Sequence, residues 1–346
     1  MDVARLPPWE VDRFVTLLDR RDRVAATRQA FDLLDAGHTV EDVLLGLLAP
    51  AQAEVGRRWE RNEWNVAQEH ASTAITDTVL GALTLRMAAR RTHGHVVVTC
   101  AEGEWHSLPA RLFAELLGLR GWRVTFLGAS TPAGHLRRFL DDDPDTTAVA
   151  VSCSVATTVG GAHRLVEAAH SAGVPALVGG RGLGPDGRRA YAVGAEGWAP
   201  DAREAAQLLD SWVSESPDPL PVPVFGHEHL ELEAQQPELV EAALIELLTR
   251  RPMFVGLPED QLAEVRTAMV SIIQFLQATL LTGDTTLFLD EFLPWLTGVL
   301  ASRGLPAGLV REALEALAVT LRERFSTSAE LLGRGRQLIN QQDPAG

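Results

Sequence analysis

The chain has 346 residues, of which 46% are hydrophobic, and its formal net charge is −15. This length is typical of two or three domains, and the apolar share is enough for each of them to bury a core. The negative charge argues against a large nucleic-acid interface, which needs a basic face, and against binding to an anionic membrane surface.

Several further features narrow the compartment and the chemistry. No segment is expected to be long and apolar enough to span a bilayer, and the start "MDVARLPPWEVDRF" lacks the layout of a signal peptide. The two cysteines, Cys100 and Cys153, each end a strand-like run and do not predict a disulfide framework. We therefore expect a cytoplasmic protein. The chain contains no lysine, which excludes Schiff-base chemistry and a P-loop.

Residues 1–92 predict a helical bundle. Between residues 8 and 90, apolar side chains recur at three-to-four spacing, which indicates four helices joined by short loops. Gly37 is a predicted helix stop, Thr39 a predicted helix start, and Asn65 with Gln68 a predicted capping pair.

Residues 93–213 predict a Rossmann-like α/β domain. Short β-branched runs, "HVVVTC", "WRVTFLG", "TAVAVSCS" and "PALVGG", alternate with helical stretches. This alternation is typical of a parallel sheet with crossover helices. The predicted fold class is thus α/β plus all-α, with the bundle first and a further helical domain last.

Residues 214–235, which include "SESPDPLPVPVFG", predict a proline-rich linker. His227 and His229 fall within it, and we expect them on its polar face. Residues 236–346 predict a helical domain without histidine, cysteine or tyrosine. That inventory leaves no side chain for haem ligation or for covalent attachment of a bilin there.

Glu104 and His106 lie in the loop after the first predicted strand. Ligands of open parallel sheets bind at the carboxyl ends of the strands, where this loop lies. A carboxylate two residues before a histidine can hold one ring nitrogen while the other binds a metal. Because zinc would need three or four protein ligands, a single histidine better suits a metal that a macrocycle already surrounds.

This loop resembles the cobalamin-binding motif E/D-x-H-x-x-G, with Pro109 in place of its final glycine. In that family the histidine binds cobalt from below, and the nucleotide tail passes small residues at the ends of later strands. The resemblance implies His106 as the cobalt ligand. The positions that it further implies as cofactor-binding are Glu104, Ser107, Leu108, Ser152, Ser154, Val155, Gly179 and Gly180.

The bundle carries a second resemblance. Trp59 is followed after nine residues by Glu69 and His70, and this W-x9-E-H pattern is similar to the cap over cobalamin in CarH-type light receptors. The resemblance implies 5′-deoxyadenosylcobalamin or methylcobalamin, whose cobalt–carbon bond is broken by light, with Trp59 shielding the upper face. Where that family has a histidine after the tryptophan, this chain has Glu60.

The combination with a helical C-terminal domain resembles the photocobilins. That likeness implies a globin-like fold and non-covalent biliverdin, with Arg250, Arg251 and Arg266 as candidate partners of its propionates. A plain dimerisation or signal-transfer domain stays open beside it. The hypothesis from sequence is a non-enzymatic light sensor, dimeric, with no direct nucleic-acid or membrane partner. Its rivals are a corrinoid methyl carrier and a cobalamin sensor without photochemistry.

Overall fold

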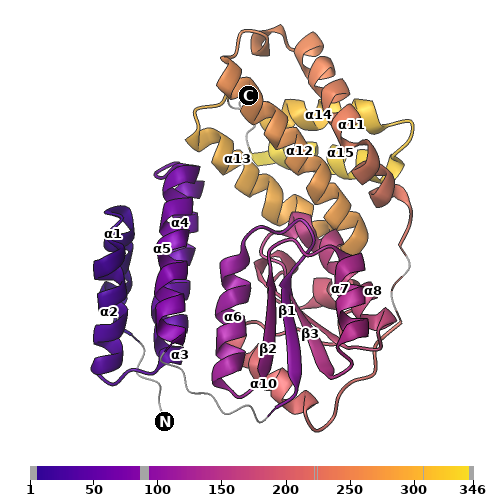
Figure 1. Ribbon diagram of the computed structural model, residues 1–346. Helices are drawn as coiled ribbons and strands as arrows, with labels where there is room; N and C mark the ends of the chain where they lie inside the picture. Colours follow the sequence, from indigo (N-terminus) through magenta and orange to yellow (C-terminus); the bar gives the residue numbers. More distant parts are fainter. Residues whose placement is uncertain (1–5, 86–92, 222, 224, 307, 343–346) are drawn as a thin grey trace. The chain divides into compact units, whose positions relative to one another are not determined.

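The computed structural model describes residues 6–85, 93–221, 223, 225–306 and 308–342. The chain folds into two compact units, Met1–Ser154 with Gly161–Val222, and Val155–Gly160 with Pro223–Gly346. The first unit contains helices α1 to α10 and the sheet, and the second contains α11 to α15 (Figure 1).

The first helices form a bundle with its own apolar core. They are α1 (Pro8–Asp19), α2 (Arg23–Asp35), the short α3 (Val40–Val43) that runs through a π-helical turn (Leu44–Leu48) into α4 (Ala49–Glu60), and α5 (Val66–Thr84). Phe14, Leu47 and Leu83 are fully buried between these helices. Leu108 and Leu112 of α6 (Ser107–Leu119) belong to the same core. The bundle is thereby joined to the α/β domain by apolar packing.

The predicted helix boundaries in the bundle are confirmed. The Thr39 side chain caps α3, and Asn65 and Gln68 form a reciprocal capping box at the start of α5. Gly37 follows α2 with a φ of +96°, a conformation that favours glycine. The end of the predicted helical region, residues 86–90, lies outside the described residues.

The predicted parallel sheet is confirmed. Its strands are β1 (His95–Cys100), β2 (Arg123–Gly128), β3 (Thr146–Ser152) and β4 (Ala176–Gly179), all parallel and in the order β2-β1-β3-β4. The chain places β2 on one side of β1 and then crosses over to place β3 on the other side. The topological switch point therefore lies between β1 and β3. Ligands of such sheets bind at this point, outside the carboxyl ends of the strands.

Helices cover both faces of the sheet (Figure 1). The remaining elements of this domain are α7 (Ala133–Asp142), α8 (Val159–Ser171), α9 (Arg188–Ala192), α10 (Ala202–Trp212) and two 3₁₀ turns (Ala156–Thr158 and Arg181–Leu183). One face packs on α6 and α10, where Val98, Leu116 and Trp212 share one core. The strands are almost continuously apolar because both faces are buried.

The second unit is wholly helical among its described residues. It comprises α11 (Glu228–Arg250), a 3₁₀ turn (Pro252–Phe254), α12 (Glu259–Thr282), a π-helical turn (Leu287–Phe292) leading into α13 (Leu293–Ser302), α14 (Leu309–Leu321) and α15 (Ser326–Gln342). Phe288, Phe292 and Phe325 are buried in its core. Gly283 ends α12 in the left-handed conformation, which favours glycine at the end of a helix.

The predicted linker boundary at residue 235 is wrong, because α11 already begins at Glu228 and accommodates Pro237 in its interior. His227 is the N-cap residue of α11, and His229 lies in the first turn, where its Nδ1 is 2.8 Å from the carbonyl oxygen of Gly226. These two histidines therefore belong to a helix start, and the helical unit is free of histidine only beyond position 229.

Helix α12 corrects a second expectation. By length and mean hydropathy it could cross a membrane, contrary to the prediction that no segment could. Half of its apolar window is buried inside the unit, where Met269, Ile272 and Ile273 are fully enclosed. A core helix of a helical domain has the same character, so the composition of α12 alone is weak support for a membrane span.

Candidate functional site

The loop after β1 is organised around the carboxylate of Glu104, of which only 1% is exposed. Its Oε1 accepts a hydrogen bond from the backbone N–H of His106 at 2.9 Å and lies 2.6 Å from the ring Nδ1 of His106. Its Oε2 accepts the backbone N–H of Ser154 at 2.9 Å. A buried carboxylate is costly unless it is hydrogen-bonded, and these partners satisfy both oxygens.

The imidazole of His106 projects outward from this anchor. Its side chain is 61% exposed, although the neighbouring carboxylate is buried. The pKa of His106 is raised, chiefly by its hydrogen bond to Glu104, and the Glu69 carboxylate on α5 adds to this effect. When Nδ1–H is held by Glu104, the lone pair for a metal is on Nε2, which is how a carboxylate prepares a histidine for metal binding.

The ends of β3 and β4 lie beside this loop. Cys100, Ser152 and Gly179 are in register at the ends of β1, β3 and β4, and the carbonyl oxygen of Ser152 accepts the N–H of Ala101 at 2.9 Å. Ser154, half-buried, follows β3 and donates to Glu104. The two halves of the sequence motif therefore meet at the switch point of the sheet.

Gly179, the last residue of β4, and Gly180, the residue after it, are glycines for different structural reasons. A Cβ on Gly179 would meet no atom within 4 Å, so this position borders open space. Gly180 has a φ of +118°, and a Cβ there would lie 2.3 Å from the carbonyl oxygen of Cys153. Gly180 is thus required by the fold, whereas Gly179 leaves room beside the strand end for a ligand such as a nucleotide tail.

Not every residue implied by the motif lies beside His106 at the carboxyl ends of the strands. Leu108 is 4% exposed and packs into the core of the bundle, so its contribution is structural here. Ser107 is the first residue of α6 and half-buried, and Pro109 occupies the third position of that helix, where a missing backbone N–H costs little. Val155 precedes the Ala156–Thr158 turn and belongs to the segment that groups with the second unit.

The cap residues lie on α4 and α5. Trp59, half-buried, is the residue before the end of α4, and the core tryptophan of this segment is Trp64, which is 5% exposed. Trp59 is therefore not a core residue of the bundle. Glu69 and His70 follow the capping box of α5, with Glu69 Oε2 2.6 Å from Nδ1 of His70, whose side chain is 73% exposed.

Two further residues hold Glu69 in place. Thr73 donates its hydroxyl to Oε1 of Glu69 at 3.0 Å, and the amide of Gln52 on α4 donates to that hydroxyl at 2.6 Å. These contacts join α4 and α5 to the carboxylate of Glu69, whose charge contributes to the raised pKa of His106. Gln52 and Thr73 were missed in the sequence analysis. Their hydrogen bond joins two helices 21 positions apart in the chain, and no local motif marks it.

Ser130 is another residue that the sequence reading missed. It lies in the loop after β2 with a φ of +48°, and its Oγ accepts the N–H of Gly103 at 3.0 Å. Its own N–H donates to the carbonyl oxygen of Glu104 at 2.9 Å. The loop after β2 therefore clamps the loop that carries His106. Within the described ranges no three His, Cys, Asp or Glu side chains gather as a metal site, so His106 would supply a single ligand.

Comparisons with known families agree with this geometry. Residues 11–84 match one model described as a B12 binding domain, and residues 94–207 match a second model of that description. The two matches coincide with the bundle and with the α/β domain. The chain has a cobalamin-binding module. The globin-like character of the C-terminal unit is not confirmed by any of these matches.

Two curated relatives come from Myxococcus xanthus. The chain is 35% identical over 129 residues to the HTH-type transcriptional repressor CarH and 32% identical over 108 residues to the HTH-type transcriptional repressor CarA. These alignments cover 34% and 30% of this chain. The chain spans 42% of the length of CarH and 36% of that of CarA.

The fold of the module has a solved counterpart. The monomethylamine corrinoid protein of Methanosarcina barkeri superposes with a TM-score of 0.52 at 19% identity, covering 58% of this chain and 97% of that protein. At this identity the likeness concerns the fold alone.

Proposed function

We propose that this protein is a cytoplasmic light sensor that uses adenosyl- or methylcobalamin as its chromophore. The observation that carries the proposal is the 2.6 Å contact between Glu104 and His106, in a chain whose helices α4 and α5 carry Trp59, Glu69 and His70. The similarity of the chain to the repressor CarH supports a regulatory function.

The residues of the module suit this cofactor. His106 would hold the metal through Nε2, with Glu104 fixing the ring, and the open space beside Gly179 would receive the nucleotide tail. When bound, cobalamin supplies a cobalt–carbon bond that light breaks. Trp59 would cover the upper face of the cofactor. The Gln52–Thr73–Glu69 contacts would hold α4 and α5 in one arrangement until light removes the upper group.

The upper face departs from the receptor family at one position. Glu60, half-buried at the end of α4, stands where the family has a histidine. A carboxylate binds cobalt less strongly than an imidazole does, because imidazole nitrogen is the softer ligand. We therefore propose that the light state keeps water or hydroxide above the metal, or recruits His70, instead of the family's second histidine.

The C-terminal unit is proposed to be the output or second sensory domain. A globin-like fold with non-covalent biliverdin, beside the cobalamin module, would add a longer-wavelength input. The proposal includes a homodimer, no catalytic turnover and no direct nucleic-acid or membrane partner. All three suggested propionate partners are ion-paired within the protein: Arg266 with Glu241, Arg250 with Glu246 and Glu315, and Arg251 with Glu312. Arg250 and Arg251 also line a polar cavity.

A methyl-carrying corrinoid protein is the second candidate function. The superposition on the monomethylamine corrinoid protein favours it, since bundle and sheet occur there in a fold of the same kind. A carrier must expose the upper face to partner enzymes. Trp59 on the cap therefore discriminates the two functions.

Absorption spectra before and after green light test the proposal. Protein reconstituted in the dark with adenosylcobalamin should convert under light, His106→Ala should bind with an altered spectrum, and His135→Ala, an exposed residue on α7, should behave as wild type. Trp59→Ala should keep binding but change the light response. Binding without light-driven conversion, unaffected by Trp59→Ala, would favour the carrier, and no binding would refute both.

A further inference from the structure

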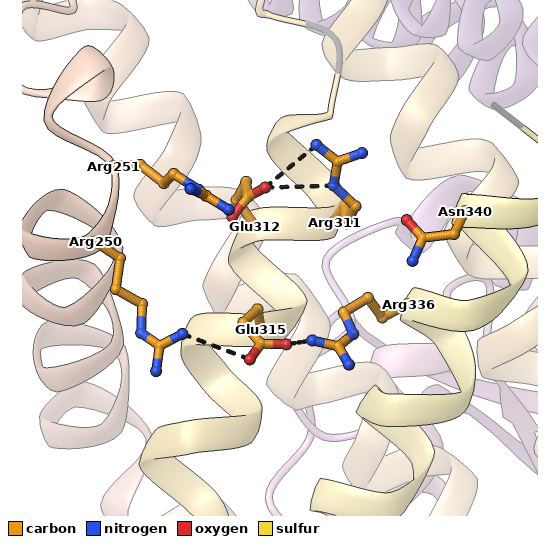
Figure 2. Close-up of a pocket in the computed structure, with 7 residues that line it drawn as sticks. All are labelled: Arg250, Arg251, Arg311, Glu312, Glu315, Arg336 and Asn340. Carbon is orange, nitrogen blue, oxygen red and sulfur yellow. Dashed lines mark hydrogen bonds and ion pairs between the residues drawn. The ribbon is translucent and has the colours of Figure 1, made fainter. Parts of the chain in front are cut away.

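A cavity in the C-terminal unit is lined only by charged and amide side chains (Figure 2). It has a volume of about 310 Å³ and lies between the end of α11 and helices α14 and α15. Its lining consists of Arg250, Arg251, Arg311, Glu312, Glu315, Arg336 and Asn340. These seven side chains offer no apolar wall on which a ring or hydrocarbon chain would gain by burial. A ligand of this cavity must be small and polar.

The first set of charges surrounds Glu312. Its carboxylate accepts hydrogen bonds from Nε of Arg251 at 2.7 Å and from Nε of Arg311 at 3.3 Å. The side chain of Glu312 is 11% exposed. Burial alone would raise the pKa of Glu312, but the two guanidinium groups outweigh it and hold that pKa below its ordinary value. Two cations therefore share one carboxylate at this end of the cavity.

The second set surrounds Glu315 and repeats the first. Its carboxylate lies 3.5 Å from Nη1 of Arg250 and is ion-paired with Arg336 (Figure 2). Glu312 and Glu315 are three residues apart on α14, so the two sets are neighbours on one side of that helix. Even with Glu246, which also accepts from Arg250, four arginines face three carboxylates. The cavity is thus positive within a chain of net charge −15.

We propose that this cavity binds a compact anion with two acidic groups, of the diphosphate or dicarboxylate kind. Arginine forks match the oxygens of phosphate and carboxylate groups and hold them with paired hydrogen bonds. Each acidic group would meet one of the two arginine pairs, and the amide of Asn340, one turn from Arg336 on α15, would add a neutral donor. This site is independent of the cobalamin proposal, since all its residues lie in the second unit.

Titration calorimetry of the full chain tests the site, with pyrophosphate and succinate as probes at matched ionic strength. Saturable binding of pyrophosphate is expected. Arg336→Gln should weaken it roughly tenfold or more, because it removes a charged hydrogen-bond donor from the cavity. Glu315→Gln should instead tighten it, since the competing internal carboxylate is neutralised. Arg266→Gln, which alters an arginine outside the cavity that pairs with Glu241, is the matched control and should bind as wild type.

The outcomes separate the two ligand classes and the null result. Binding of pyrophosphate alone supports the proposal and assigns phosphoryl compounds, and binding of succinate as well assigns acidic groups in general. The proposal is overturned if neither probe binds saturably. It is equally overturned if Arg336→Gln and Arg266→Gln bind pyrophosphate with the affinity of wild type, because binding would then lie elsewhere.

Discussion

The carboxylate of Glu104 accepts the backbone N–H of Ser154 at 2.9 Å across 50 positions of sequence. This hydrogen bond joins the loop after β1 to the end of β3 at the switch point of the sheet. The other oxygen of Glu104 orients His106. One buried side chain therefore positions the candidate cobalt ligand and closes the two halves of the cobalamin-binding motif against each other.

Replacing Glu104 by glutamine should damage both stability and binding. The amide offers one acceptor oxygen, so its NH₂ group would face a backbone donor and leave a buried group without a partner. We expect a loss of about 1–3 kcal/mol in the free energy of unfolding, together with weaker binding of adenosylcobalamin. Urea unfolding and a spectral titration measure the two effects.

The matched control for this change is Glu102→Gln. Glu102 forms a half-exposed ion pair with Arg164, with 2.8 Å between Nε and Oε2, and exposed pairs contribute about 1 kcal/mol or less. Equal unfolding free energies for the Glu104 and Glu102 variants would contradict the anchoring function of Glu104.

Substitutions of Gly179, the last residue of β4, and of Gly180, which follows it, should have opposite effects on stability and cobalamin binding. Gly179→Val places its side chain in open space and should change the free energy of unfolding by about 1 kcal/mol or less, yet lower cobalamin affinity roughly tenfold or more by filling the room for the tail. Gly180→Ala forces a Cβ against Cys153 and should cost about 3 kcal/mol or more.

Unfolding curves and cobalamin titrations of both variants separate the two cases. Gly118→Ala, near the end of α6 with no atom within 4 Å of the added carbon, is the control and should bind cobalamin as wild type does. Undiminished affinity in a folded Gly179→Val protein would remove Gly179 from the site.

Local signals made the sheet and the motif predictable. Runs such as "HVVVTC" are long, β-branched and bounded by helical periods, and β1 spans all of these residues. Glu104 and His106 are two positions apart, so their contact is a local property that the sequence exposes.

Contacts between distant segments were not predictable in the same way. The clamp of Ser130 on Gly103 joins loops 27 positions apart, and no short-range pattern marks it. The proline-rich stretch "SESPDPLPVPVFG" predicted a linker up to residue 235, whereas α11 begins at Glu228. Pro237 lies within α11 and removes one backbone hydrogen bond from it. The buried side chains of Leu232 and Leu239, on either side of Pro237, stabilise the helix by packing into the core.

Glu196 should tether the proline-rich segment to the sheet. Its side chain is 2% exposed, and its oxygens accept the backbone N–H groups of Ala176 and Leu220, both at 2.6 Å, and contact Nε2 of His170 at 2.9 Å. Glu196→Gln removes an acceptor for one of these donors, so residues 214–221 should detach more often. Limited proteolysis should cut this segment faster than in wild type.

The control for the tether is Glu215→Gln, an exposed residue at the start of the same segment. It should leave the cleavage rate unchanged. If the Glu196 and Glu215 variants are cut at the same rate, the hydrogen bond to Leu220 does not hold the segment.

His95 should make the α/β domain less stable in mild acid. Its ring is 3% exposed, with Nε2 2.8 Å from Oγ1 of Thr125 and Nδ1 3.0 Å from Asp143. Burial lowers the pKa of His95 below its ordinary value of 6.5, and Arg123 adds to the shift while Asp143 opposes it. The unfolded chain therefore binds a proton more readily than the folded chain, so the contribution of neutral His95 to stability is complete above pH 6.5 and is lost as the pH falls toward the folded pKa.

Urea unfolding between about pH 5 and 7.5 should show a steeper loss of unfolding free energy for wild type than for His95→Gln. The two proteins would have parallel pH profiles if His95 were protonated equally in the folded and unfolded states.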